Sequence, residues 1–426
     1  MSYIYILNKK IMNLKLLNRI NFAALIAAYF YFSYLKIYHT VPYHVFFLAT
    51  GIIINIARYN YMVRYLDKRV ILLFILLFFV VGKTYLIYPG EGVIRDLFGN
   101  ILINLSIVYY VFTLVRNEKD MVFFENTIIY IASLSMLVAI FQFFNFDFAW
   151  EMRKFINFND DLNDPITNQL IERNRPGGLA YYAITYSYQM LILASIFIAK
   201  YFENPTFKNT IWAIFGVFGL FVCLTRSSML GLIIAVVAFI VFRNFSLKRL
   251  LIAIVLIVIL GIGFVIQETR DISSVNNLVR YYLFLSGIDV FMDFIISGVG
   301  GQNYIEYTSK YMENYNAPTW SVNQGVHNAF LTVLIKHGVF MLIPIFYLYY
   351  IYFRNIRLLK FVDFRSYAFF YVYMISYTFH SFFHNAGMFS KDQLFWIIFA
   401  YMLAVKHIHK NKLYNLGIKK KYASYR

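Results

Sequence analysis

Carboxylates are scarce in this chain, and their positions are as informative as their number. The 426 residues include 21 Asp and Glu against 39 Lys and Arg, and charged residues make up only 14%. No apolar block carries a central Asp or Glu, whereas an ion-coupled transporter usually needs a titratable carboxylate or a broken helix at the middle of the membrane. The sequence also has no D-x-D motif. These absences argue against ion-coupled transport.

Cysteine is almost absent as well. The single cysteine, Cys223, lies in an apolar stretch, so an intramolecular disulfide and a metal-thiolate site are both excluded. His380 and His384 are spaced i, i+4 in "HSFFHN" and could share a zinc ion, but no carboxylate accompanies them as it does in a metalloprotease motif. We therefore expect no metal and no cofactor.

Long apolar runs are what the sequence has in abundance, since 61% of its residues are hydrophobic. Blocks of roughly twenty apolar residues are typical of membrane-spanning helices. The first block is not followed by a small-residue cleavage site, so we expect it to be a retained helix. The pattern predicts an all-α, polytopic bundle of about twelve transmembrane helices, forming one integral membrane domain over 1–426. The blocks lie near 18–36, 41–57, 70–88, 98–115, 124–145, 179–199, 209–225, 227–242, 250–267, 329–353, 366–383 and 393–405.

The basic residues predict an orientation. With the N-terminus inside, two thirds of the 39 basic residues fall on one face, including those of the tail 406–426. The positive-inside rule then makes both termini cytoplasmic. Two long segments remain outside, a first loop at 146–178 and a large loop at 268–327. The net charge of +18 is explained by topology and by attraction to anionic membrane lipids, and no nucleic-acid partner is indicated.

Some arginines are not explained by the inside rule. Arg173 and Arg175 precede an apolar block in "ERNRPGGLAYYAITY", Arg226 interrupts "FVCLTRSSMLGLII", and Arg280 opens a stretch of the large loop. An arginine between apolar helices is costly, and guanidinium groups suit phosphate oxygens because they donate two parallel hydrogen bonds. Arg226 alone could instead snorkel or cap a helix. Four such residues near one face predict a site for a phosphate-bearing anion.

A histidine stands where the large loop meets the next apolar block. His327 titrates near neutrality and can take a proton from a hydroxyl, while Asn328 can cap the helix that follows. Lys336 lies within that helix, near the same face. The alternative is that His327 is an ordinary interfacial loop residue.

Three ordered motifs resemble those of the O-antigen ligase and polymerase superfamily. They are "LTRSSMLGL" (224–232), "RYYLFLSGIDVFMDFIISGVGGQNY" (280–304) and "HNAFLTVLIKHG" (327–338). In that family a T-R element precedes a helix, an arginine opens an amphipathic stretch ending in G-x-G, and H-N-x-x-L leads to a glycine. The resemblance covers about 170–340. Near its start the chain keeps Arg175 and Gly178 but lacks the asparagines that follow in the family.

The resemblance implies glycan transfer from undecaprenyl diphosphate at the outer face of the bacterial cytoplasmic membrane, without a metal. Arg226 and Arg280 would hold the diphosphate with Arg175 as a third partner, and His327 would act as general base in an inverting reaction. Asn328 and Lys336 would support the site.

The same motifs serve two kinds of enzyme. We favour a surface polysaccharide polymerase, with a chain-length regulating co-polymerase as a further partner. The composition, rich in Phe, Ile, Tyr and Asn, indicates an AT-rich gene, as is common for serotype-specific polysaccharide loci. A ligase that moves the polymer to lipid A core and a polysaccharide flippase remain the alternatives.

Overall fold

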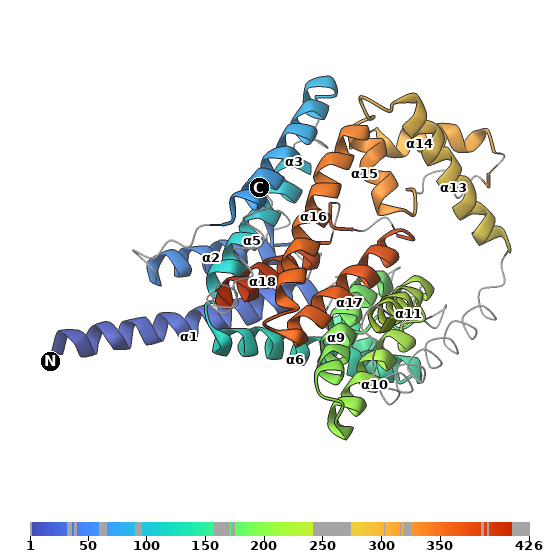
Figure 1. Cartoon of the computed structure of the whole chain (residues 1–426). Coiled ribbons are helices and arrows are strands. Elements are labelled where there is room, and N and C mark those ends of the chain that lie inside the picture. The colour runs from blue at the N-terminus through green and yellow to red at the C-terminus, as the bar shows by residue number, and fades with distance from the viewer. Residues whose placement is uncertain are drawn as a thin grey trace.

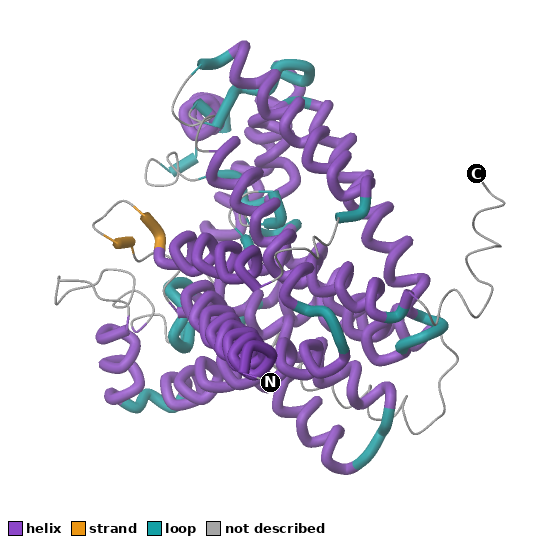
Figure 2. The backbone as a smooth tube through the Cα atoms, turned by 90° about the vertical axis from the view of Figure 1, so that its left-hand side faces the viewer, coloured by secondary structure: helices purple, strands orange, loops and turns teal. Residues whose placement is uncertain are grey.

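The structure, a computed structural model, is helical almost throughout the residues that it describes. These are 2–31, 36–37, 41–58, 66–89, 96–156, 171, 175–241, 274–301, 303–315, 317–318, 325–384, 387–389 and 392–410. Within these ranges the strands are one antiparallel pairing of two residues each, between β1 (Lys36–Ile37) and β2 (Val41–Pro42), drawn in orange in Figure 2. The prediction of an all-α fold is confirmed.

Most of the helices begin and end close to the predicted apolar blocks, although the first, Ser2–Tyr31, begins well before its block at 18–36. Several of them start where an Asp, Asn or Thr side chain accepts a hydrogen bond from the first turn, as at Asp67, Asn117, Thr206 and Asp363. The first group comprises α1 (Ser2–Tyr31), α2 (Tyr43–Arg58), α3 (Lys68–Ile87), the π-helix η1 (Asp96–Leu102), α5 (Ile103–Leu114), α6 (Glu118–Phe143) and α7 (Asp147–Ile156). The second comprises α9 (Ala183–Glu203), α10 (Phe207–Val222), α11 (Arg226–Val241), α13 (Ser274–Asp293), α14 (Tyr304–Glu313), α15 (Ala329–His337), the 3₁₀ turn η3 (Val339–Met341), α16 (Leu342–Leu359), α17 (Phe364–Ser381) and α18 (Leu394–Ile408).

Four helical segments among the described residues are long and apolar enough to cross a membrane. They are α3, α6, α9 and the stretch Val339–Leu359, and five further apolar helices of 10–17 residues accompany them. A membrane protein is therefore supported, while the count of twelve spans and the side on which the termini lie stay predictions. The predicted block 250–267 and most of the tail 406–426 lie outside the described residues.

One predicted block is two helices. The block 329–353 breaks at Gly338, whose φ of +76° ends α15 before η3 leads into α16. A side chain at Gly338 would lie 2.5 Å from the carbonyl oxygen of Ile296, so the chain can approach this closely only at a glycine. Lys83 of α3 donates to the carbonyls of Ile296 and His337 across the break, at 2.6 and 3.1 Å. The continuous apolar composition of 329–353 does not predict this bend.

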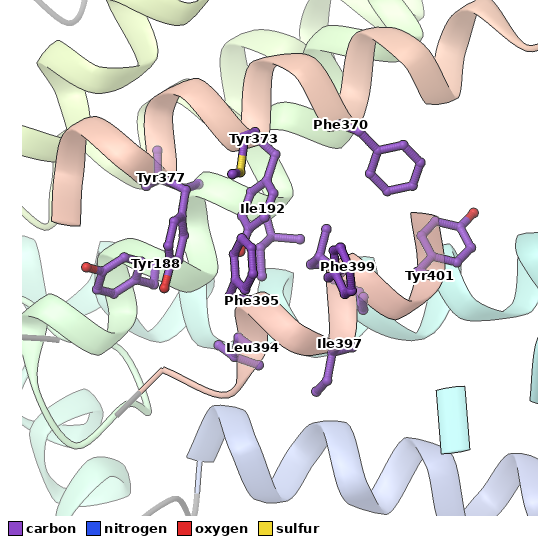
Figure 3. Packing of buried hydrophobic residues seen from close by; sticks show 14 of the residues in the cluster. Tyr188, Ile192, Phe370, Tyr373, Tyr377, Leu394, Phe395, Ile397, Phe399 and Tyr401 are labelled. Carbon is purple, nitrogen blue, oxygen red and sulfur yellow. The ribbon is translucent and has the colours of Figure 1, made fainter. Parts of the chain in front are cut away.

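The main core lies where α9, α17 and α18 meet. The side chains of α18 are buried on every side from Leu394 to Val405, which places this helix at the centre of the bundle. Figure 3 shows its Phe395 against Tyr377 of α17, with ring centroids 5.0 Å apart, and Tyr188 of α9 beside Tyr377 at the same separation. Aromatic packing thus fixes α9 against α17.

The segment predicted to be the large outer loop is mostly helical in the part that the structure describes. This segment, 268–327, contains α13 and α14, which gather beside α15 at one side of the molecule (Figure 1). A small separate core holds these three helices together, formed by Val290, Val299, Tyr304, Val326, Leu331 and Ile335. We call α13, α14 and α15 the outer cap.

Candidate active site

The candidate site lies where α11 and α17 pack closely against each other. A Cβ added to Gly231 would lie 2.7 Å from the carbonyl oxygen of Ser376. The backbones of the two helices therefore approach each other closely at this glycine. Ser227 lies four residues before Gly231, and His380 lies four residues after Ser376. Because positions four apart share a helix face, the contact brings Ser227 to His380.

Four side chains form a buried hydrogen-bonded chain at this point. Ser187 Oγ, on α9, donates to the carbonyl of Ile184 at 2.6 Å and lies 2.8 Å from His380 Nε2. His380 Nδ1 lies 2.8 Å from Ser227 Oγ, which in turn lies 2.9 Å from His384 Nε2. We call Ser187, His380, Ser227 and His384 the serine–histidine chain. It joins α9, α11 and the end of α17.

Arg175 reaches this chain from a loop with a fixed shape. Gln142 Oε1 accepts from the backbone N–H groups of Gly177 and Gly178 at 3.1 and 2.9 Å, and its Nε2 donates to the Gly178 carbonyl at 3.1 Å. Gly178 has a φ of +56°, and a Cβ there would meet the Ser135 carbonyl oxygen at 2.4 Å. The loop therefore needs glycine, and it places the charge of Arg175 where it acts on His380 and His384.

His327 enters from the outer cap. Asn328 caps α15 through a 2.9 Å hydrogen bond from the backbone N–H of Leu331, as the sequence predicts. The backbone N–H of Val326 donates to the hydroxyl of Tyr304 at 2.6 Å, which fixes the residue on the other side of His327. Burial, together with the charge of Arg280, lowers the pKa of His327 to about 4. The imidazole is therefore neutral at pH 7 and can accept a proton.

Arg280 lies on α13 with its side chain exposed. Its charge acts on His327 and on His384. Arg175, Arg280 and His327, which come from three separate parts of the chain, therefore all act electrostatically on His384. Two positive charges beside neutral imidazoles are an arrangement suited to an anion next to a proton-bearing group.

The other predicted residues are placed as follows. Arg226 is the first residue of α11, half-buried, and directly precedes Ser227 of the serine–histidine chain. Lys336 lies with its Nζ 5.4 Å from the centre of the Tyr304 ring, so it packs within the outer cap. Arg173 lies outside the described residues.

The sequence pattern indicates His380 and His384 only as a possible metal-binding pair, and it gives Ser227 no role. Three of the four ring nitrogens of these histidines lie at hydrogen-bond distance from serine hydroxyls. Such a pair leaves one nitrogen for a ligand rather than two for a metal. Two sequence features could have predicted these contacts: the serine directly after Arg226, and the i, i+4 spacing of the two histidines.

A comparison with known protein families matches part of this region. Residues 211–346 match the family described as O-antigen ligase, a segment that includes Arg226, Arg280 and His327 and leaves out Arg175 and His384. No curated protein matches the chain. The match confirms the resemblance indicated by the ordered motifs: residues 211–346 are similar to a family whose members are membrane enzymes of the glycosyltransferase and ligase type.

Proposed function

We propose that this protein is a surface polysaccharide polymerase that joins repeat units carried on polyprenyl diphosphate at the outer face of the bacterial cytoplasmic membrane. The observation that carries the proposal is that the charges of Arg175 and Arg280 act on His384, and that of Arg280 also on the buried His327. The donor is a dianionic diphosphate next to a sugar, and a cluster of arginines beside a neutral base matches those two parts.

The proposed reaction is a single displacement. The arginines neutralise the negative charge that develops on the leaving diphosphate, a task that many nucleotide-sugar enzymes give to a divalent metal. His327 takes the proton of the acceptor hydroxyl as its oxygen bonds to the anomeric carbon. The bond from that carbon to the diphosphate oxygen breaks, and the polyprenyl diphosphate leaves. Attack opposite the leaving group inverts the anomeric centre.

Arg226 completes the proposed diphosphate site. Its place at the start of α11 puts it next in sequence to Ser227, and the first turn of a helix offers backbone N–H groups and a positive dipole end to an anion. Asn328 supports His327 by holding the N-terminus of α15.

A ligase is the second candidate, because the matched family carries that description. Both enzymes use the same kind of donor and differ in the acceptor. A polymerase accepts another lipid-linked repeat unit, and a ligase accepts a sugar of lipid A core.

Deletion of the gene followed by gel analysis of surface glycan separates the candidates. We expect loss of the ladder with a single repeat unit still attached, whereas loss of all attached glycan means a ligase. Complementation with His327→Ala or Arg226→Ala should leave the ladder at least about 100-fold weaker, the usual contribution of a general base or a charged transition-state contact. Lys310→Ala, an exposed change on α14, is the matched control. Normal ladders from stably inserted His327→Ala and Arg226→Ala proteins would remove both residues from the mechanism.

A further inference from the structure

The hydrogen bonds of the serine–histidine chain can run in one direction only. The oxygens of Ser187 and the Ile184 carbonyl are 2.6 Å apart, and a carbonyl carries no proton, so the Ser187 hydroxyl must donate there. Ser187 has no second proton. The contact with His380 is then a hydrogen bond that His380 Nε2 donates.

The direction of this hydrogen bond fixes the direction of the next ones in the serine–histidine chain. A positive charge on either imidazole is costly beside the arginines, so each ring is neutral and carries one proton. His380 Nδ1 is then an acceptor and takes the Ser227 proton, and His384 Nε2 must donate to Ser227 Oγ. His384 Nδ1 is therefore left with a lone pair that none of these serine hydroxyls uses.

That lone pair has no hydrogen-bond partner among the residues that the structure describes, although the His384 side chain is 7% exposed. Burial and the positive charges of its neighbours lower the pKa of His384, so the lone pair persists at neutral pH. An unsatisfied buried acceptor is costly, and this one belongs to a ring on which Arg175, Arg280 and His327 act electrostatically.

We propose that His384 Nδ1 accepts a hydrogen bond from a hydroxyl of the sugar that is linked to the diphosphate. The arginines attract the phosphate oxygens, but a lone pair repels them, so the group that faces His384 must bring a proton. Among the parts of the donor next to the diphosphate, a sugar hydroxyl meets that need. This inference rests on the proposed function, and it makes His384 a substrate-binding residue.

Two substitutions at His384 separate this role from a structural one. In His384→Asn the amide oxygen takes the place of Nδ1 and the contact with Ser227 is lost. In His384→Gln the terminal amide takes the place of Nε2 and the Nδ1 acceptor is lost. The test uses the purified protein in lipid nanodiscs and the lipid-linked glycan extracted from the deletion strain.

We expect His384→Asn to keep a KM within about twofold of wild type, and His384→Gln to raise KM about tenfold with kcat unchanged, the loss of one neutral hydrogen bond made equally in the ground and transition states. The reverse order, or equal effects, would overturn the proposal. If the wild-type protein transfers no glycan from this extract, the proposed function itself fails.

A second pair of variants guards against misfolding at position 384. Ser187→Ala removes the group that sets the direction of the chain, so His384 divides between its two tautomers and KM should rise about twofold or more. Ser195→Ala, which removes a buried hydroxyl of the same helix α9, should leave KM unchanged. Equal KM values for the two serine variants would overturn the assignment.

Discussion

At the scale of single residues, the proposed reaction depends on the effect of Arg280 on the basicity of His327. Burial and the arginine together lower the pKa of His327 to about 4, which keeps it neutral but makes it a weak base in the free protein. In the proposed complex, the diphosphate neutralises Arg280 and removes part of that influence. The donor would thus raise the basicity of the residue that starts the reaction.

The pH dependence of the rate should reveal this coupling. A general base must be deprotonated, so kcat/KM, which reports the free enzyme, should stay level down to about pH 5 and fall as the pH drops through about 4. The acid limb of kcat should lie at higher pH, because the bound diphosphate raises the pKa of His327. The measurement is the initial rate of glycan transfer between pH 3.5 and 8.

Arg280→Gln tests the cause. The variant is slower, and the acid limb of its kcat/KM profile should move upward, by part of the distance to the ordinary pKa of histidine, because burial remains. Lys310→Gln makes the same change of charge on the outer cap and should leave the limb in place. An acid limb near pH 6.5 in the wild-type protein would exclude His327 in the environment described here.

The contact between α11 and α17 matters most at the scale of elements. It depends on a single glycine, Gly231, and it sets the separation of Ser227 and His380. Gly82 of α3 provides a contrast, because a Cβ there would meet nothing within 4 Å. The two positions therefore separate the effect of helix propensity from that of helix packing.

Gly231→Ala should destabilise the protein by about 1–3 kcal/mol, because the methyl group forces the two helices apart. Gly82→Ala should stabilise it by about 0.5–1 kcal/mol, since alanine loses less backbone entropy in a helix. The fraction of protein that stays monodisperse after heating in detergent measures both. Gly231→Ala should also lower transferase activity, because Ser227 moves away from His380. Equal thermal stability of the two variants would contradict the close packing.

The whole molecule raises the question of which side of the membrane the site faces. The basic residues predict cytoplasmic termini, and the same prediction puts the outer cap, with His327 and Arg280, at the opposite face. A single buried cysteine makes this testable, since Cys223→Ser gives a cysteine-free chain in one step.

Single cysteines introduced into the cysteine-free protein should react with a maleimide according to the side of the membrane on which they lie. Asn314→Cys, at the end of α14, should react in intact cells with a membrane-impermeant maleimide, and Ser424→Cys, in the predicted cytoplasmic tail, should react only after the membrane is opened. The Cys223→Ser parent gives the background signal. Labelling of Ser424→Cys in intact cells would reverse the predicted orientation and place the site on the cytoplasmic side.

Much of the fold could be read from the sequence because it depends on local interactions. The apolar blocks that the structure describes are helices, Asn328 caps α15, and the ordered motifs pointed to the family that residues 211–346 match. The bend at Gly338 was missed, because composition does not report a positive φ. Arg175, Arg280 and His327 were singled out one at a time, from charge and position.

Only the tertiary structure decided which of these residues meet. Ser187 and His380 are 193 positions apart, and Ser227 and His384 are 157 apart, so their contacts depend on how α9, α11 and α17 pack. The free lone pair of His384 follows from the direction of a hydrogen-bonded chain that crosses three segments. The sequence by itself determined the described helices and the family match over 211–346, because backbone hydrogen bonding and burial follow local composition, and the motifs are local strings. The identity of the acceptor nitrogen required the three-dimensional arrangement, because a tautomer is set by neighbours that are distant along the chain.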